Sequence, residues 1–229
     1  MGCKAITQAL QAHALAPRDV DAIVITHEHI DHVAALPIWC KSTPTTVYAP
    51  QAICSYLRQK VVLSEVVEIT SSFTVGDVCV DYYECSHDAR ACFGYKFSVG
   101  NASFASVTDT GIVTDKLVEF LSPCQAVMVE SNHDVDMLVS GPYSYVLKQR
   151  ILSNYGHLSN AQCGEILCKI APKGVKNIIL AHLSETNNTK ELAFNAAVNA
   201  FASCGITEGK QVNVFVADQH HNEVTICLD

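Results

Sequence analysis

Short apolar segments that predict buried strands alternate along the chain with segments of helical periodicity, and this alternation constrains the fold most strongly. The predicted strands cover residues 21–25, 46–49, 66–69, 77–84, 125–130 and 175–182. The predicted helices cover residues 4–15, 114–121, 144–152, 159–171 and 188–203. Strands that alternate with helices in this way indicate an α/β fold.

Two hairpins complete the expected element order. Residues 91–99 and 102–107 predict antiparallel strands, with Gly100 and Asn101 as their turn. The last segment, residues 211–228, predicts a closing hairpin with His220 and His221 at its tip. Neither a linker nor an internal repeat interrupts the 229 residues, so we expect one domain over residues 1–229.

Composition narrows the class of protein. Apolar residues make up 49% of the chain and charged residues 17%, which is typical of a globular protein. No apolar run reaches the ~20 residues that a membrane-spanning helix requires, so we expect no membrane partner. Eleven cysteines without any CxxC spacing favour reduced thiols and a cytoplasmic location over a disulfide framework. The formal net charge of −8 argues against non-specific electrostatic binding of nucleic acid. A polyanion would have to be bound by a few specifically placed side chains and by metal ions.

A dense group of potential metal ligands follows the first predicted strand. The motif places His27, His29, Asp31 and His32 within six positions. Two histidines at positions i and i+2 of a loop can bind one ion, and the aspartate and third histidine can then reach a second. This spacing differs from the helical HExxH of zinc proteases. Imidazole with carboxylate suits Zn²⁺, and also Mn²⁺ or Fe²⁺.

Five polar residues stand at, or within three residues of, the carboxyl ends of five predicted strands. Sites in α/β sheets gather at that edge, so these side chains are expected to converge although they lie far apart in the sequence. The residues are His27, His87, Asp109, Glu130 and His182.

The HxHxDH motif, with the later segments CSHDA, VTDTG and LAHLS, closely resembles the metallo-β-lactamase fold. This resemblance implies an αββα sandwich and a site for two divalent metal ions, zinc or manganese, with iron also suitable. The first implied ligand set is His27, His29, His87 and Asp109. The second implied ligand set is Asp31, His32, Asp109 and His182, with Asp31 counted as catalytic as well.

The segments VTDTGIVTD, ESNHDVDML and LKQRILSNYGHLSN further resemble the YycJ/WalJ branch of this fold. That branch is associated with metal-dependent DNA exonuclease activity, so DNA is the expected substrate. A hydroxide shared by two metal ions would attack the phosphodiester in line. Two catalytic residues, Glu130 and His157, correspond to an acidic residue and a histidine of the related tRNA-processing nucleases, and His157 would protonate the leaving group. Alternatively, His157 merely precedes a helix that Ser159 caps.

Three further residues are candidates for substrate binding. Lys148 and Arg150 could hold phosphates or could lie on a solvated helix face. His133 could line the substrate pocket, act as a spare ligand or precede a helix as its cap. Pocket lining is the favoured interpretation for His133.

The chain departs from the family pattern at its beginning, where the resemblance implies two opening strands that this sequence lacks. A sheet edge would then be exposed, and a second copy of the chain could cover it. Two other functions stay open at this point. One is hydrolysis of a small ester, lactone or phosphodiester by the same fold, and the other is an inactive metal-binding protein that acts through an interface.

Overall fold

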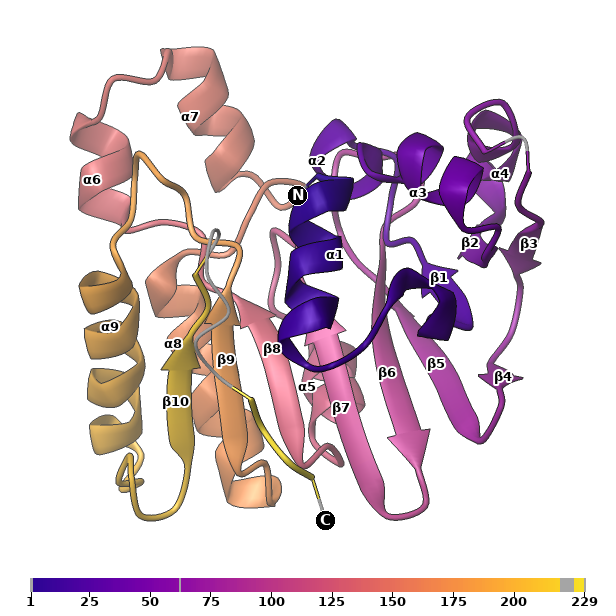
Figure 1. Ribbon diagram of the computed structural model, residues 1–229. Coiled ribbons are helices and arrows are strands. Elements are labelled where there is room, and N and C mark those ends of the chain that lie inside the picture. The colour runs from indigo at the N-terminus through magenta and orange to yellow at the C-terminus, as the bar shows by residue number, and fades with distance from the viewer. Residues whose placement is uncertain (1, 62, 219–224, 229) are drawn as a thin grey trace. The chain divides into compact units, whose positions relative to one another are not determined.

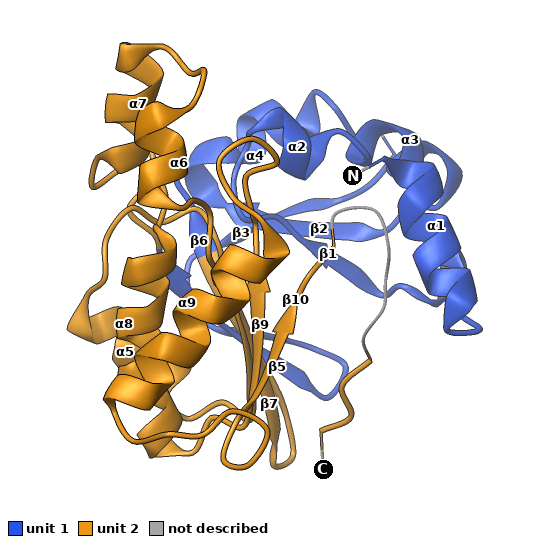
Figure 2. Ribbon diagram, turned by 90° about the vertical axis from the view of Figure 1, so that its left-hand side faces the viewer, with its two compact units in different colours: residues 1–84, 89–93 blue, residues 85–88, 94–229 orange. Residues whose placement is uncertain are grey.

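The computed structural model describes residues 2–61, 63–218 and 225–228, and the chain divides into two compact units. Unit 1 comprises residues 1–84 and 89–93, and unit 2 comprises residues 85–88 and 94–229 (Figure 2). Each unit is described by itself below. The expectation of a single domain over residues 1–229 stays a prediction.

Unit 1 contains a three-stranded parallel sheet and a separate hairpin. The sheet order is β1-β2-β3, formed by Ala22–Val24, Thr46–Pro50 and Val66–Ile69. The hairpin pairs β4 with β5, formed by Phe73–Val75 and Val78–Glu84. The helices are α1 Cys3–Ala12, α2 Ile30–Val33, α3 Leu36–Ser42 and α4 Gln51–Arg58, with a 3-10 turn at Pro17–Asp19.

A compact apolar core holds the parallel sheet of unit 1 to its helices. Helix α4 buries Ile53 and Leu57, which are four residues apart and therefore share one helix face. They belong to the same buried cluster as Val47 of β2 and Trp39 of α3. The indole of Trp39 donates a hydrogen bond to the Thr45 hydroxyl over 3.1 Å, so its polar group is satisfied inside this core.

Unit 2 is built on a sheet in the order β10-β9-β8-β7-β6. Its strands are β6 Phe93–Val99, β7 Ala102–Val107, β8 Ala126–Glu130, β9 Asn177–Ala181 and β10 Asn213–Val216. Only the β6–β7 pair among these is antiparallel. The helices are α5 Asp115–Leu121, α6 Val135–Ser140, α7 Tyr145–Leu152, α8 Asn160–Ile170 and α9 Lys190–Ser203, with a 3-10 turn at Ala171–Lys173.

The helices of unit 2 form two groups. Helices α5, α8 and α9 lie on one face of the sheet (Figure 2). Gly164 allows α8 to approach α9 closely, because a Cβ atom there would lie 2.8 Å from the Cβ atom of Ala200. Helices α6 and α7 instead extend beyond the carboxyl ends of β8 and β9 (Figure 1). This is the edge where the sequence predicts the functional residues.

The predicted α/β pattern is confirmed, including the 91–107 hairpin, but the closing hairpin is wrong in the described residues. Strand β10 pairs in parallel with β9, and residues 225–228 form no strand. Helix α9 supplies the long crossover that a parallel pair requires. Apolar alternation predicts that a segment is a strand but leaves its partner open. The predicted hairpin tip with His220 and His221 lies outside the described residues.

In the part of the chain that the structure describes, every helix is too short or too polar to cross a membrane.

Candidate metal centre

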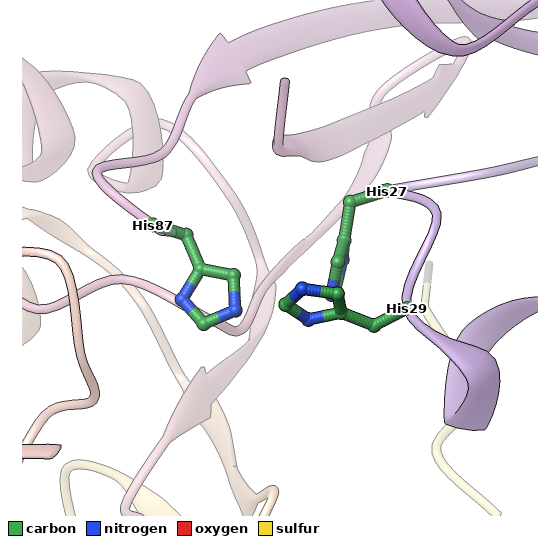
Figure 3. Close-up of side chains that lie close together, drawn as sticks. All are labelled: His27, His29 and His87. Carbon is green, nitrogen blue, oxygen red and sulfur yellow. The ribbon is translucent and has the colours of Figure 1, made fainter. Parts of the chain in front are cut away.

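The loop that leaves β1 presents the first group of potential ligands in unit 1. His27 is buried, His29 and His32 are half-buried, and Asp31 is exposed. The ring centroids of His27 and His29 lie 4.5 Å apart, with the rings nearly perpendicular. Figure 3 labels these two side chains and the His87 side chain of unit 2.

Thr26 fixes one nitrogen of two of these histidines. Its hydroxyl lies 3.1 Å from Nδ1 of His27 and 3.0 Å from Nδ1 of His32. In His32, Nε2 lies on the other side of the ring, 3.5 Å from a carboxylate oxygen of Asp31. Because a partner holds Nδ1, the Nε2 atoms are the ones that can bind an ion.

Two candidate ligands of unit 2 lie in strained backbone positions at strand ends. Asp109 follows β7 and His182 follows β9, with φ angles of 58° and 57°. The left-handed region is unfavourable for residues other than glycine, and such strain is found mainly at functional sites. The fold therefore constrains the two side chains that the sequence assigns to the metal site.

Two histidines of unit 2, His87 and His182, also have Nδ1 held by a neighbouring group. Nδ1 of His182 lies 2.7 Å from a carboxylate oxygen of Glu130, and its Nε2 lies 3.5 Å from Oδ1 of Asp109. Nδ1 of His87 lies 3.2 Å from the carbonyl oxygen of Gly156, and its Nε2 lies 3.7 Å from the same Asp109 atom. Histidines that bind metal ions typically have Nδ1 held by a carboxylate or a carbonyl oxygen in this way. The donor set therefore fits divalent metal ions.

Glu130 is a buried hydrogen-bond acceptor that holds several polar groups of unit 2 in place. One of its oxygens accepts hydrogen bonds from Nδ1 of His157 and Nδ1 of His182, over 2.8 and 2.7 Å. The other accepts from the backbone amides of Thr110 and Leu158, over 3.2 and 3.1 Å. Burial alone would raise the pKa of Glu130, but the hydrogen bonds and the charges of His157 and His182 together outweigh burial and hold the pKa below its ordinary range. Glu130 is therefore an anion whose two carboxylate oxygens each accept two hydrogen bonds from neighbouring groups.

His157 joins the same group, as the sequence predicts. Ligand atoms of Asp109, Glu130, His157 and His182 all lie within 4.8 Å of one another. Burial lowers the pKa of His157, yet the hydrogen bond to Glu130 and the negative charges of Glu130 and Asp109 together outweigh burial and raise the pKa above its ordinary value. Burial lowers the pKa of His87, in contrast. Because Glu130 holds Nδ1 of His157, Nε2 is the atom through which this ring can exchange a proton with a ligand.

A buried polar network ties together the three segments that carry Glu130, His157 and His182. The side chains of Asn160 and Asn188 exchange hydrogen bonds over 3.0 and 2.8 Å. Asn188 also donates to the Ser131 carbonyl oxygen over 2.8 Å, and the Ser131 hydroxyl donates to Asn160 over 2.7 Å. These residues lie just after β8, at the start of α8 and just before α9. The network therefore fixes the relative position of the histidines and Glu130.

Replacing Asn188 by alanine should lower the free energy of unfolding by about 1–3 kcal/mol, because the Ser131 carbonyl and the Asn160 amide lose buried partners. Urea unfolding measures this change. Asn195→Ala is the matched control, since Asn195 is exposed on α9, and it should shift the free energy by less than about 0.5 kcal/mol. Equal urea midpoints for Asn188→Ala and the wild-type protein would contradict a structural role for the network.

A pocket of about 390 Å³ opens beside this site within unit 2. Its lining includes His157, His182 and Arg150. The guanidinium of Arg150 forms an ion pair with Asp88, which also lines the pocket. That ion pair raises the pKa of Arg150. The pocket therefore combines a candidate catalytic histidine, His157, and a candidate metal ligand, His182, with one cation, Arg150, whose charge Asp88 balances.

Two of the predicted substrate-binding residues have other surroundings. Lys148 donates a hydrogen bond to the Val139 carbonyl oxygen near the end of α6, over 2.7 Å. His133 is not among the residues lining this pocket, whereas its neighbour Asn132 is. His133 is buried, and burial lowers its pKa to about 4. A contact of Lys148 or His133 with substrate stays a prediction.

The sequence does not reveal the groups that orient the histidine rings. Thr26 stands directly before the HxHxDH motif, but nothing in the pattern shows that its hydroxyl reaches two rings. The carbonyl oxygen of Gly156 is a backbone atom and leaves no trace in the residue type. A Cβ atom on Gly156 would meet the carbonyl oxygen of Ile151, so this glycine is required by close packing next to His157.

Comparison with known proteins gives a consistent result. The family model described as "Beta-lactamase superfamily domain" matches residues 4–183. The exodeoxyribonuclease WalJ of Streptococcus pneumoniae is 36% identical over 219 residues, which cover 93% of this chain and 81% of WalJ. The exodeoxyribonuclease YycJ of Bacillus anthracis is 33% identical over 222 residues, which cover 93% of this chain and 83% of YycJ.

Solved structures share the fold. Zn²⁺-bound PqqB of Methylobacterium extorquens superimposes with a TM-score of 0.64 and 18% sequence identity, covering 96% of this chain and 80% of PqqB. The expected α/β fold of the metallo-β-lactamase type is therefore confirmed.

Proposed function

The chain belongs to the metallo-β-lactamase superfamily of metal-dependent hydrolases, in the branch of the exodeoxyribonucleases WalJ and YycJ, and we propose that it is a two-metal phosphodiesterase that removes nucleotides from DNA ends. One observation carries this proposal most directly. His87 and His182 each have Nδ1 held by an acceptor and Nε2 turned toward the same carboxylate oxygen of Asp109. This arrangement presents a carboxylate and two imidazoles for metal binding.

The proposed ligands are those that the sequence motifs imply. His27, His29 and His87 would bind one ion, and Asp31, His32 and His182 the other, with Asp109 binding both. Support comes from the HxHxDH motif and from membership of the family. The ring orientation within each unit supports it as well, because Thr26 holds Nδ1 of His27 and of His32. Imidazole and carboxylate ligands suit Zn²⁺ or Mn²⁺, and also Fe²⁺.

When bound, two divalent ions supply Lewis-acid stabilisation of the phosphoryl oxygens and activate a water molecule at neutral pH. The protein's own contribution is proton transfer and orientation. His157 would donate a proton from Nε2 to the oxygen of the leaving nucleotide, because Glu130 holds its Nδ1 over 2.8 Å. Glu130 acts through two rings, His157 and His182, and is a positioning residue that does not itself touch the substrate.

DNA is the proposed substrate because WalJ and YycJ are named exodeoxyribonucleases. A net charge of −8 disfavours electrostatic contacts with many phosphates along a duplex. A strand end bound in a pocket needs only a few such contacts. The proposal includes a cytoplasmic location, since all eleven cysteines are free thiols. It also includes a second copy of the chain at the β1 edge of the unit 1 sheet.

The test is digestion of an end-labelled DNA duplex in the presence of Mn²⁺ or Zn²⁺. Stepwise loss of nucleotides is expected for the wild-type protein. The His29→Ala, Asp109→Asn double variant is the control and should leave the DNA intact.

Two substrates run in parallel to identify other outcomes. Cleavage of bis(p-nitrophenyl) phosphate without any DNA digestion would move the substrate to a small phosphodiester. A protein that hydrolyses the thioester but neither phosphodiester substrate would contradict the assignment as a phosphodiesterase. No turnover of any substrate by metal-loaded protein would contradict the assignment as an enzyme.

A further inference from the structure

One wall of the pocket has no role in the proposed reaction. Tyr143, Leu147 and Ile151 line it, at intervals of four residues. Residues four apart on a helix share one face, so Leu147 and Ile151 of α7 form a continuous apolar strip, and Tyr143 extends it just before the Ser144 cap. His157 and His182 line the same pocket. An aromatic ring and two aliphatic side chains therefore line the same cavity as His157 and His182.

We propose that this wall binds the base and sugar of the terminal nucleotide, with Tyr143 as the surface on which the base stacks. This inference rests on the proposed function and specifies which part of the DNA substrate the pocket binds. Stacking on aromatic side chains is the general means of binding unpaired bases, and it tolerates any base sequence. A strand-end nuclease that degrades DNA of every sequence needs that kind of contact.

The size and charge of the pocket support this occupant. A volume of about 390 Å³ lies in the lower part of the range for small-molecule sites and suits one nucleotide rather than a duplex. Besides the histidines, the charged lining residues are Asp88, Arg150 and Glu185. Arg150 is already paired with Asp88, so this part of the pocket offers no unbalanced positive charge to a phosphate. An uncharged base and sugar therefore suit the wall, while the scissile phosphate lies toward the histidines.

The pocket wall is distinct from the remaining surface of α7. Tyr145 is two positions from Tyr143, is 75% exposed and is not among the pocket residues. It therefore provides a control of the same residue type in the same segment. A general loss of aromatic surface near the site would affect both tyrosines, whereas a base subsite depends on Tyr143 alone.

The first test measures binding of nucleotides and does not require DNA cleavage. Metal-loaded protein is titrated with deoxyadenosine 5′-monophosphate and 3′-monophosphate, and with the matching deoxyribose phosphates that lack a base. The wild-type protein should bind at least one nucleotide about 10- to 100-fold more tightly than its base-free counterpart, the range expected from stacking of one base. In Tyr143→Ala this ratio should fall to near one. Tyr143→Phe should preserve it, since the ring remains, and Tyr145→Ala should also preserve it.

The second test uses turnover. Single-stranded DNA with an abasic terminal nucleotide should be cleaved about 10- to 100-fold more slowly than the natural strand by the wild-type protein, with the abasic unit placed at each end in turn. Tyr143→Ala should show no such preference for the natural end.

The two tests separate failure of the subsite from failure of the nuclease assignment. A wild-type protein that prefers nucleotides through Tyr143 but leaves DNA intact would keep the subsite and remove the exonuclease function. DNA cleavage with equal binding of nucleotides and base-free phosphates, or with a preference that survives in Tyr143→Ala, would overturn the subsite.

Discussion

Replacing Asp109 by asparagine should reduce hydrolysis of both DNA and bis(p-nitrophenyl) phosphate by about 10³-fold or more. The carboxylate oxygen Oδ1 of Asp109 lies 3.5 Å from Nε2 of His182 and 3.7 Å from Nε2 of His87, and Asp109 is the proposed acidic ligand among these side chains. Asparagine keeps the shape of the side chain but removes the negative charge that a divalent cation requires. It also tolerates the left-handed backbone at this position, where φ is 58°.

The fold should therefore survive the Asp109→Asn change, and circular dichroism with thermal unfolding checks this. Asp115→Asn is the matched control, because Asp115 is exposed at the start of α5. Its kcat/KM should stay within twofold of the wild-type value. If the Asp109→Asn protein hydrolysed either substrate at a wild-type rate, Asp109 could not be the shared ligand.

Replacing His157 by alanine should lower kcat for DNA by about 10²–10⁴-fold, the usual effect of a general acid. The same change should affect bis(p-nitrophenyl) phosphate much less. A nucleotide leaves as an alkoxide and needs a proton, whereas p-nitrophenolate is stable without one. Because Glu130 fixes Nδ1 of His157 and also Nδ1 of His182, the remaining ring should keep its position in the variant.

The comparison of leaving groups separates a proton donor from a structural residue. His13→Ala is the control, since His13 is exposed at the end of α1, and it should leave both rates within twofold of wild type. A His157→Ala protein that loses both activities to the same extent would argue against proton donation and for a role in holding the site together.

The strand positions and the candidate ligands could be predicted from the sequence because both depend on local patterns. The apolar run before His27 and the one before His182 each predict a buried strand, and each strand is observed. Buried histidines at such ends are rarely needed for packing, so the residue types themselves indicate metal binding. Glu130 is also a candidate from the sequence because it stands at the end of β8, whereas its proposed role comes from the family resemblance.

The rest depends on tertiary structure that residue types do not encode. Strand β10 shows the alternation of a hairpin strand but pairs in parallel with β9, because α9 carries the chain across. Lys148 resembles a phosphate ligand in sequence, yet its ammonium group donates to a carbonyl oxygen of α6. The sequence around Tyr143 contains no pattern that indicates substrate binding. Its place in the pocket emerges only when α7 extends beyond the ends of β8 and β9.

The central claim is that the protein binds two metal ions that share Asp109 as a ligand, and electron paramagnetic resonance of the Mn²⁺-loaded protein tests it most directly. Two Mn²⁺ ions that share a carboxylate couple magnetically, so the wild-type protein should bind two equivalents and give the spectrum of a coupled pair. Asp109→Asn should lose that coupling. Two bound ions with the six-line spectrum of isolated Mn²⁺, or a single ion whose binding is unaffected by Asp109→Asn, would contradict the account.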